Sequence, residues 1–382
     1  MGRTLRRLGY AWNHSTDPVL AWSRAAWDTV SWWRGECLLS LPAGDGVTFG
    51  YAGPASRGAG PPAVLQFLEE HRERAGATTA GRASCRPGYL PRTSLPGADL
   101  VLVGCGRRRA HALPGAAAIV LPSRVHFVLD TTVDYPTARR RVSKKERQAY
   151  EAGRRKHGWR LEVASRGEDF AFFYDQMHVP TMRRRHGDRA RSERREVARD
   201  CVFRHGLLVF VVGSGHRVAG GLCRWDARRR TLTWRLCGVL DGAEEHYAAG
   251  AMGALYHCLL EWSCNQGRVE RLDLQGSEPF LSRGVFQCKR KFHPRIEIPA
   301  NHFRHRRLWL HVPADSPQVR DFLVANPVVA ETPGGQLRAI YFYDRERPVR
   351  TDVPWSCPGI VGERAVDLDE FLTGRRKEAL RA

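Results

Sequence analysis

Long apolar segments are missing from this 382-residue chain. Its clean apolar runs, such as 116–121 and 207–212, fall far short of the ~20 residues that cross a bilayer. The basic first segment, MGRTLRRLGYAWNHSTD, also lacks the apolar stretch of a signal peptide. We therefore expect a cytoplasmic protein without membrane insertion.

Cysteine pairs at zinc or redox spacing are absent too. The ten cysteines are scattered, with no C-x-x-C pair and no Cys/His cluster, so no metal site is expected. Several lie inside apolar stretches, which predicts reduced and mostly buried thiols. No internal repeat with a period of about 20–50 residues is visible.

Basic residues are abundant: 61 Lys and Arg stand against 40 Asp and Glu, for a net charge of +21. Such a charge attracts nucleic acid, anionic lipid headgroups or phosphorylated small molecules. The Arg-rich, Ala-rich and Gly-rich usage is also what a high-GC genome produces, so charge alone does not choose a partner. The hydrophobic fraction of 42% is typical of a folded protein.

The length suits two modest domains and an extension. Residues 1–135 mix Gly/Pro-rich breaks with short apolar runs that predict strands at 99–103 and 124–129 and a helix at 62–74. Residues 301–382 predict a strand, a short helix, a hairpin around Pro333-Gly334-Gly335 and a solvated tail, RRKEALRA.

Residues 136–300 carry sharper signals. Ser143 with Glu146 predicts a helix that ends at Gly158, followed by a strand in WRLEVA. Ser165 with Glu168 predicts a second helix, which Pro180 should end. Three strand-like runs at 207–213, 217–226 and 231–239 indicate an antiparallel meander, and a long helix ending at Gly267 and a strand in VERLDLQG follow.

Three segments of this part carry a family resemblance. SKKERQAYEAGRRKHGWRLEV resembles the basic helix and strand that precede the meander in Fem-type transferases of the GNAT acyltransferase superfamily. VFVVGSGHRVAGGLCRWD is similar to the family's hairpin, with its turn before V-A-G, and GRVERLDLQGSEPFLSRGVFQCKRKF resembles its late strand and lysine-bearing segment. The resemblance covers about 137–298. It implies an α/β (α+β) fold with GNAT-like, mixed, mainly antiparallel sheets flanked by helices. The family also implies two such units, of which 1–135 is degenerate and 136–300 catalytic.

The family passes an acyl group from a CoA thioester or, in the Fem branch, from an aminoacyl-tRNA ester to an amine. CoA users hold the pyrophosphate on a loop of the form [Q/R]-x-x-G-x-[G/A] at a helix start. Aligning Gly250 with this loop leaves Tyr247 and Met252 at its two ends, where neither fits. Close packing of a core helix is the other explanation for Gly250 and Gly253. We therefore expect no cofactor and a tRNA donor.

The region 139–195 concentrates charge, with 18 basic residues against eight acidic ones. Phosphates of tRNA are the natural partner of such a region, and a merely solvated helix face is the alternative. The candidate tRNA-binding residues here are Lys144, Lys145, Arg147, Arg154, Arg155, Lys156, Arg183, Arg184 and Arg185.

Aminolysis of an ester needs a neutral amine and a stabilised oxyanion. Asp273, near the end of an apolar strand, is the candidate to orient or deprotonate the amine, with capping of the next turn as the alternative. The resemblance makes Lys289 and Lys291 candidates to hold a phosphate or to offset the oxyanion charge, against surface solvation. Phe292 is a candidate to stack on the terminal adenine, against a core position, and Arg283 is a weaker binding candidate.

Histidines on the expected helices, His178, His246 and His257, are expected to be structural rather than general bases. The first hypothesis is therefore an aminoacyl-tRNA-dependent transferase that acts on a small-molecule, peptide or peptidoglycan-precursor amine. A CoA-dependent N-acyltransferase and a catalytically silent GNAT-like RNA-binding protein are the alternatives.

Overall fold

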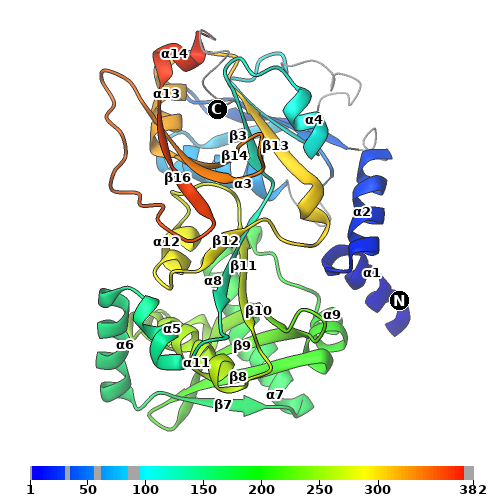
Figure 1. Cartoon of the computed structure of the whole chain (residues 1–382), viewed down its shortest axis with the longest axis vertical. Coiled ribbons are helices and arrows are strands. Elements are labelled where there is room, and N and C mark those ends of the chain that lie inside the picture. The colour runs from blue at the N-terminus through cyan, green and yellow to red at the C-terminus, as the bar shows by residue number, and fades with distance from the viewer. Residues whose placement is uncertain (1, 31–34, 56–61, 85–94, 374–382) are drawn as a thin grey trace. The chain divides into compact units, whose positions relative to one another are not determined.

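The computed structural model describes residues 2–30, 35–55, 62–84 and 95–373, and the predicted tail RRKEALRA lies outside them (Figure 1). The chain forms two compact units that alternate along the sequence. Unit 1 contains residues 1–11, 126–275 and 289–295, and unit 2 contains 12–125, 276–288 and 296–382. Each unit is thus built from segments that are distant in sequence.

Unit 1 is organised around a mixed sheet. Its order is β12-β6-β11-β10-β9-β8-β7, in which β7 to β10 are antiparallel and β11 is parallel to β10. The strands are β6 (Val125–Asp130), β7 (Arg160–Ala164), β8 (Gly206–Gly213), β9 (His216–Asp226), β10 (Thr231–Val239), β11 (Arg271–Ser277) and β12 (Arg295–Glu297). The predicted meander and late strand are confirmed.

Helical elements accompany this sheet along the chain. They are α5 (Tyr135–Arg141), α6 (Lys144–His157), α7 (Gly167–Phe172), η3 (Phe173–His178), α8 (Val179–His186), η4 (Gly187–Arg189), α9 (Arg195–Val197), η5 (Ala198–Val202), η6 (Phe203–His205), η7 (Leu240–Gly242), α10 (Glu244–Ala248) and α11 (Ala251–Asn265). The helix α1 (Arg3–His14) begins in unit 1 and ends in unit 2, and α12 (Gly284–Arg290) begins in unit 2 and ends in unit 1. The predicted helix–strand–helix order before the meander is therefore confirmed.

The ends of α6 follow the predicted capping chemistry. The Ser143 hydroxyl accepts a hydrogen bond from the backbone N–H of Glu146, and Gly158 ends the helix in a left-handed conformation with φ of 63°. A side-chain acceptor at the start and a glycine at the end satisfy backbone groups that have no partner inside the helix.

The next helix differs from its prediction at both ends. It begins at Gly167 rather than after Ser165, because the Asp169 carboxylate accepts the backbone N–H of Arg166. It also continues past Pro180. The π-helical turn η3 ends at His178, so Pro180 occupies the second position of α8, where a helix tolerates the missing N–H.

Unit 2 contains two further sheets. One has the order β3-β1-β2-β4-β13-β5 and the other β14-β15-β16. Their strands are β1 (Glu36–Pro42), β2 (Phe49–Gly53), β3 (Thr79–Ser84), β4 (Leu100–Gly106), β5 (Ala118–Pro122), β13 (Arg306–His311), β14 (Val328–Glu331), β15 (Leu337–Tyr343) and β16 (Ile360–Asp367). The helical elements are α2 (Pro18–Val30), α3 (Ala63–Arg74), α4 (Arg107–Ala112), η8 (His302–His305), α13 (Pro317–Ala325) and α14 (Leu368–Leu372).

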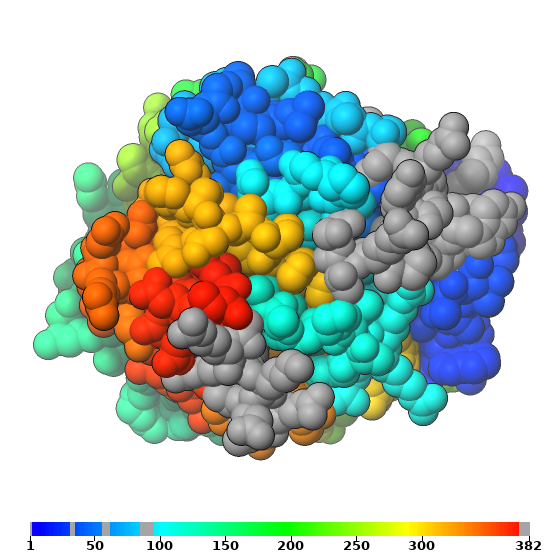
Figure 2. All heavy atoms as spheres, turned by 90° about the horizontal axis from the view of Figure 1, so that it is seen from above, coloured from blue at the N-terminus to red at the C-terminus, as the bar shows by residue number. Residues whose placement is uncertain are grey.

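The expected division into 1–135, 136–300 and 301–382 differs from this arrangement. Strand β13 pairs antiparallel with both β4 and β5, so residues 301–382 complete the N-terminal sheet instead of forming an extension. Figure 2 shows the early segments (blue to cyan) and the late segments (orange to red) of unit 2 side by side on one face. Local sequence patterns contain no information on such a pairing.

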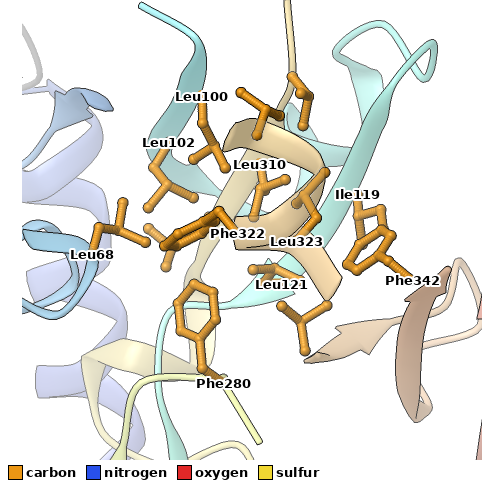
Figure 3. Packing of buried hydrophobic residues seen from close by; sticks show 14 of the residues in the cluster. Leu68, Leu100, Leu102, Ile119, Leu121, Phe280, Leu310, Phe322, Leu323 and Phe342 are labelled. Carbon is orange, nitrogen blue, oxygen red and sulfur yellow. The ribbon is translucent and has the colours of Figure 1, made fainter. Parts of the chain in front are cut away.

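The core of unit 2 joins these distant segments. Figure 3 shows Leu100 and Leu102 of β4, Leu310 of β13, and Phe322 and Leu323 of α13 packed together. Phe280 and Phe342 belong to the same buried cluster. Burial of such side chains, each contributing roughly 1.5–3 kcal/mol, holds the late segments against the early ones.

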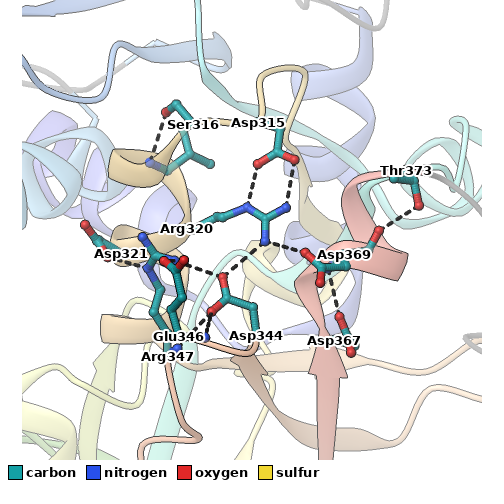
Figure 4. Close-up of polar contacts among 11 residues, drawn as sticks. Asp315, Ser316, Arg320, Asp321, Asp344, Glu346, Arg347, Asp367, Asp369 and Thr373 are labelled. Atoms are coloured by element: carbon teal, nitrogen blue, oxygen red, sulfur yellow. Dashed lines mark hydrogen bonds and ion pairs between the residues drawn. The ribbon is translucent and has the colours of Figure 1, made fainter.

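Arginine and carboxylate side chains form a polar network around α13. Arg320 binds Asp315, Asp344 and Asp369, and Arg347 binds Asp344 and Asp321 (Figure 4). Hydrogen bonds from Asp315 and Asp369 raise the pKa of the Arg320 guanidinium. The network therefore connects α13 through ion pairs to Asp344, directly after β15, and to Asp369 of α14.

The cysteines correct one expectation. Eight of the cysteines in the described part of the chain are free, and most of these are buried, as predicted. Cys37 is disulfide-bonded instead, so the prediction that all ten are reduced is wrong. Within the described residues, no helix has both the length and the apolar character needed to span a bilayer.

We predict that Glu331→Ala will lower the free energy of unfolding by about 3–5 kcal/mol, because it leaves the buried guanidinium of Arg307 without its carboxylate. Urea denaturation followed by circular dichroism measures the effect. The matched control is Asp352→Ala, which removes the exposed Arg350 ion pair and should cost less than about 1 kcal/mol. Equal losses in the two variants would contradict the assignment.

Candidate active site

A histidine and an aspartate from neighbouring strands form the centre of the candidate site. His126 lies on β6 and Asp273 on the adjacent β11. The His126 Nδ1 atom is 2.9 Å from Oδ2 and 3.2 Å from Oδ1 of Asp273. Only 12% and 13% of the two side chains are exposed. The contact is therefore a largely buried His–Asp pair.

The Asp273 carboxylate is charged despite its burial. Burial alone would raise its pKa, but the charge and hydrogen bond of His126, the backbone N–H of Gln275 at 2.7 Å and the charge of Lys289 outweigh it and lower the pKa. An ionised carboxylate only accepts hydrogen bonds, so His126 Nδ1 must carry the proton. In the neutral ring the lone pair then lies on Nε2.

The Nε2 atom of His126 makes no hydrogen bond to any of the described residues. A ring that donates from Nδ1 to a carboxylate and keeps Nε2 open can take a proton from a reacting group, and the carboxylate stabilises the resulting imidazolium. The pair therefore has the arrangement of a general base.

Lys289, which the family resemblance makes a candidate site residue, lies beside this pair. It comes from the end of α12, is only 6% exposed, and donates from Nζ to the Gln275 carbonyl at 3.2 Å. Its ammonium also lies 5.2 Å from the centre of the Phe127 ring. The alternative of surface solvation is wrong for Lys289. Asp273 and Lys289 are thus brought together.

Lys291 does not join them. Its ammonium pairs with Glu146 of α6 at 3.3 Å, and its carbonyl accepts the backbone N–H of Ser143. Phe292 is 2% exposed and stacks on Tyr256, with ring centres 5.0 Å apart. Its predicted role in adenine stacking is wrong, because a core aromatic has no free ring face. Lys291 is placed to fix the start of α6.

Arg283 belongs to unit 2 and has carboxylate partners there. Its guanidinium binds Glu278 at 3.0 Å and Glu70 at 2.9 Å and lies 4.7 Å from the Phe67 ring centre. These contacts use its charge within unit 2. The structure supports a structural position for Arg283 rather than a binding one.

The predicted tRNA-binding residues lie mostly at the surface. Lys144, Lys145, Arg154, Arg155 and Lys156 of α6 are exposed, and no ion pair to a described residue is recorded for any of them.

The remaining members of the set differ among themselves. Arg183 and Arg184 of α8 are also exposed without a recorded ion pair, whereas Arg185 lies 3.6 Å from the Tyr247 ring centre. Arg147 is half-buried. Charges without acidic partners remain available for an external anion.

The start of α11 is packed rather than open. A Cβ atom added to Gly250, which has φ of 90°, would lie 3.2 Å from the Trp159 ring, and one added to Gly253 would lie 3.2 Å from the Glu146 carboxylate. The alternative of close packing is supported for both glycines. A carboxylate at this helix start also opposes the binding of a pyrophosphate.

The three histidines named from the sequence do not belong to the site. His257 is fully buried and stacked on Tyr150, and burial lowers its pKa to about 3. His178 is buried beside the Cys237 carbonyl, with its pKa also lowered by burial. His246 is half-buried, 3.9 Å from Glu245. The structural interpretation fits His178 and His257.

His126 is the residue that the sequence reasoning missed. It is the one polar side chain between Val125 and Leu129 in an otherwise apolar strand. That exception was the available signal, but its partner is 147 positions away. No group of three His, Cys, Asp or Glu side chains suited to a metal ion occurs among the described residues.

Unit 2 contains a separate cavity of about 520 Å³ beside the edge strand β5. Trp309 and Ile340 contribute apolar walls, and Glu331, Arg338 and Arg364 contribute charged ones. No candidate site residue lines it, so it does not bear on the His–Asp pair.

Comparison with known proteins gives distant structural likenesses. No protein-family model and no curated protein sequence matches the chain. The structure is similar to FemX at 8% identity and a TM-score of 0.39, covering 82% of this chain and 96% of that one. It is also similar to L-PGS from Bacillus licheniformis at 13% identity and a TM-score of 0.35, covering 76% of this chain and 85% of that one. The structure is similar as well to a putative lysylphosphatidylglycerol synthetase C-terminal domain from Agrobacterium fabrum, at 10% identity and a TM-score of 0.35, covering 81% of this chain and 90% of that one.

The pair makes a prediction about acid stability. The lowered pKa of Asp273 means that its contribution to stability is present above the unfolded-state pKa and is lost as pH falls through the folded-state value. We expect Asp273→Asn to cost about 1–3 kcal/mol of unfolding free energy at pH 7. The difference from wild type should shrink below about pH 4.

Chemical denaturation at a series of pH values measures this difference. Asp45→Asn, at an exposed turn, is the control and should match wild type throughout. A difference for Asp273→Asn that is the same at pH 7 and at low pH would show that the carboxylate charge is not what stabilises the pair.

Proposed function

We propose that this protein is an acyltransferase that moves an amino acid from an aminoacyl-tRNA ester to an amine of a small-molecule or peptide acceptor, forming an amide. The observation that carries the proposal is the buried His126–Asp273 pair with Lys289 beside it. The resemblance of residues 137–298 to Fem-type transferases supports the same reaction class.

The pair suits aminolysis of an ester. The acceptor amine attacks the ester carbonyl, and His126 Nε2 takes the proton that the nitrogen loses as the C–N bond forms. Asp273 stabilises the imidazolium. Collapse of the tetrahedral intermediate breaks the C–O bond, and His126 returns the proton to the departing ribose oxygen. The positive charge of Lys289 favours the negative charge that develops on the ester oxygen.

Two observations bear on the choice between tRNA and CoA as the donor. The exposed cations of α6 and α8 have no recorded acidic partners, as binding to a phosphate backbone requires. At the start of α11, Trp159 and Glu146 occupy the surroundings of Gly250 and Gly253 and disfavour a CoA pyrophosphate. Both observations favour tRNA over CoA as the donor.

The decisive assay incubates the protein with pooled aminoacyl-tRNAs and a mixture of amines, with and without ribonuclease, and follows amide products by mass spectrometry. We expect His126→Ala to lower kcat by about 10²–10⁴-fold, the usual contribution of a general base, with little change in KM for tRNA. His216→Ala, at an exposed turn, is the matched control and should keep full activity.

The outcomes separate the alternatives. Consumption of acetyl-CoA but of no aminoacyl-tRNA would replace the proposed donor with CoA. Salt-sensitive tRNA binding without any amide product would make the chain a silent RNA-binding protein. Full activity of His126→Ala would remove His126 from the mechanism.

A second prediction concerns tRNA affinity. Replacing Lys144 and Lys145 together by Ala should weaken tRNA binding and reduce the slope of log K against log[salt] by about 2, because two phosphate contacts are lost. Filter binding at several salt concentrations measures this. Arg229→Ala with Arg345→Ala removes two exposed cations elsewhere and should leave the slope unchanged. An unchanged slope for the lysine variant would exclude α6 from the tRNA-binding surface.

A further inference from the structure

The helix α1 is held against unit 1 by arginines and one tyrosine, since Tyr10 packs on the apolar cluster that contains Phe170 and Leu208. Arg6 binds the buried carboxylate of Asp200 at 2.7 Å, and Arg7 lies 2.9 Å from Nε2 of His205. Leu5 and Leu8, one helical turn apart on another side, are 59% and 62% exposed. An amphipathic helix at the surface of a soluble protein normally buries its apolar side and exposes its polar side.

The helix α2 in unit 2 is oriented in the same unusual way. Its buried side carries Ala21 and two charged residues, Arg24 and Asp28. Arg24 and Asp28 pair with each other at 3.1 Å, and Asp28 also binds Arg306. Val19, Trp22 and Val30 are 70%, 65% and 71% exposed, and Trp27 is 49% exposed (α2 is labelled in Figure 1). The apolar side of α2 therefore faces solvent.

These two helices account for most of the exposed apolar side chains. Of the eleven large apolar residues exposed in the described chain, seven lie in α1 and α2. Scattered exposed apolar residues need no explanation, but a concentration with tryptophan marks an interaction surface.

The charges beside these residues are positive. Arg3 and Arg7 are exposed on α1, and Arg304 is exposed on η8, on which α2 packs. The two acidic residues within 3–30 are already engaged, since Asp17 caps α2 through the backbone N–H of Val19 and Asp28 is ion-paired. Asp200, beside α1, is paired with Arg6. Exposed leucine, valine and tryptophan beside unopposed cations match the apolar edge and anionic headgroups of a lipid surface.

We propose that α1 and α2 bind the surface of an anionic lipid bilayer, each helix lying in the interface with its exposed apolar side in the lipid. With 12 and 13 residues, the helices are too short to cross a bilayer, which needs ~20 residues. A nucleic acid would satisfy the cations but would leave the valines and leucines in water. This inference does not depend on the proposed transfer reaction.

The test is sedimentation of the full-length protein with vesicles of phosphatidylcholine alone or mixed with phosphatidylglycerol. We expect binding to the anionic vesicles only, weakened by salt. Trp22→Gln with Trp27→Gln should reduce binding about tenfold or more, and Leu5→Gln with Leu8→Gln should reduce it independently. The matched control is Val163→Gln with Val361→Gln, which removes two apolar side chains that are each 52% exposed elsewhere and should bind like wild type.

Three results would overturn the proposal. The first is absence of wild-type binding to anionic vesicles. The second is binding that survives both helix variants but is lost in Lys144→Ala with Lys145→Ala, which would assign it to α6. The third is a wild-type dimer in light scattering that the helix variants convert to a monomer without any vesicle binding, because a second copy of the chain would then be the partner. Circular dichroism confirms that each variant is folded.

Discussion

A carboxylate that is removed from water must be compensated, and in unit 1 this constraint brings the candidate site together. Asp273 is compensated by His126 from β6, by the backbone N–H of Gln275 and by the charge of Lys289 after α12. Without these partners, burial would favour the protonated acid. The same contacts that make the charge tolerable also set the tautomer of His126 and leave its Nε2 open. The same contacts therefore serve both the burial of the carboxylate and the general-base role that we propose for His126.

The backbone near the site reflects the same requirement. Strands β10 and β11 pair in parallel over only three positions, from Thr231 with Arg271 to Thr233 with Asp273. Beyond them, Gln275 adopts φ of 61°, its N–H reaches the Asp273 carboxylate, and its carbonyl receives Lys289. One residue in an uncommon conformation therefore serves both charged side chains. Such backbone positions persist when the surroundings determine them, as the two hydrogen bonds do here.

Much of unit 1 could be predicted from the sequence, because local sequence signals mark the ends of its helices and strands. The Ser143 cap and Gly158 fix the ends of α6, and short apolar runs separated by polar turns indicate β8 to β10. Asp273 could be named as a candidate from its place near the end of an apolar strand, and Lys289 from the family resemblance. His126 could not, since only the pairing order of the sheet brings β6 beside β11. The placement of β13 between β4 and β5 was beyond reach for the same physical reason.

The segment after α12 shows where composition misleads. In CKRKF, Lys289 is buried, Lys291 is exposed and Phe292 is buried, so three neighbouring residues have three different surroundings. A pattern of charged residues predicts one basic surface, whereas the end of α12 and the turn after it direct Lys289 and Phe292 inward and Lys291 outward. The inward lysine joins Asp273, the outward one holds α6, and the phenylalanine fills the core.

The basic residues of the chain differ in whether a carboxylate pairs with them. Arg307, Arg320 and Arg6 are tied to buried or clustered carboxylates, where a planar guanidinium can satisfy several oxygens. The exposed cations of α6 have no recorded acidic partner among the described residues, although acidic residues occur throughout the chain. Arg229 and Arg345 are exposed in the same way, so what distinguishes α6 is the clustering of five such cations on one helix. That clustering is the feature on which the proposed tRNA-binding surface depends.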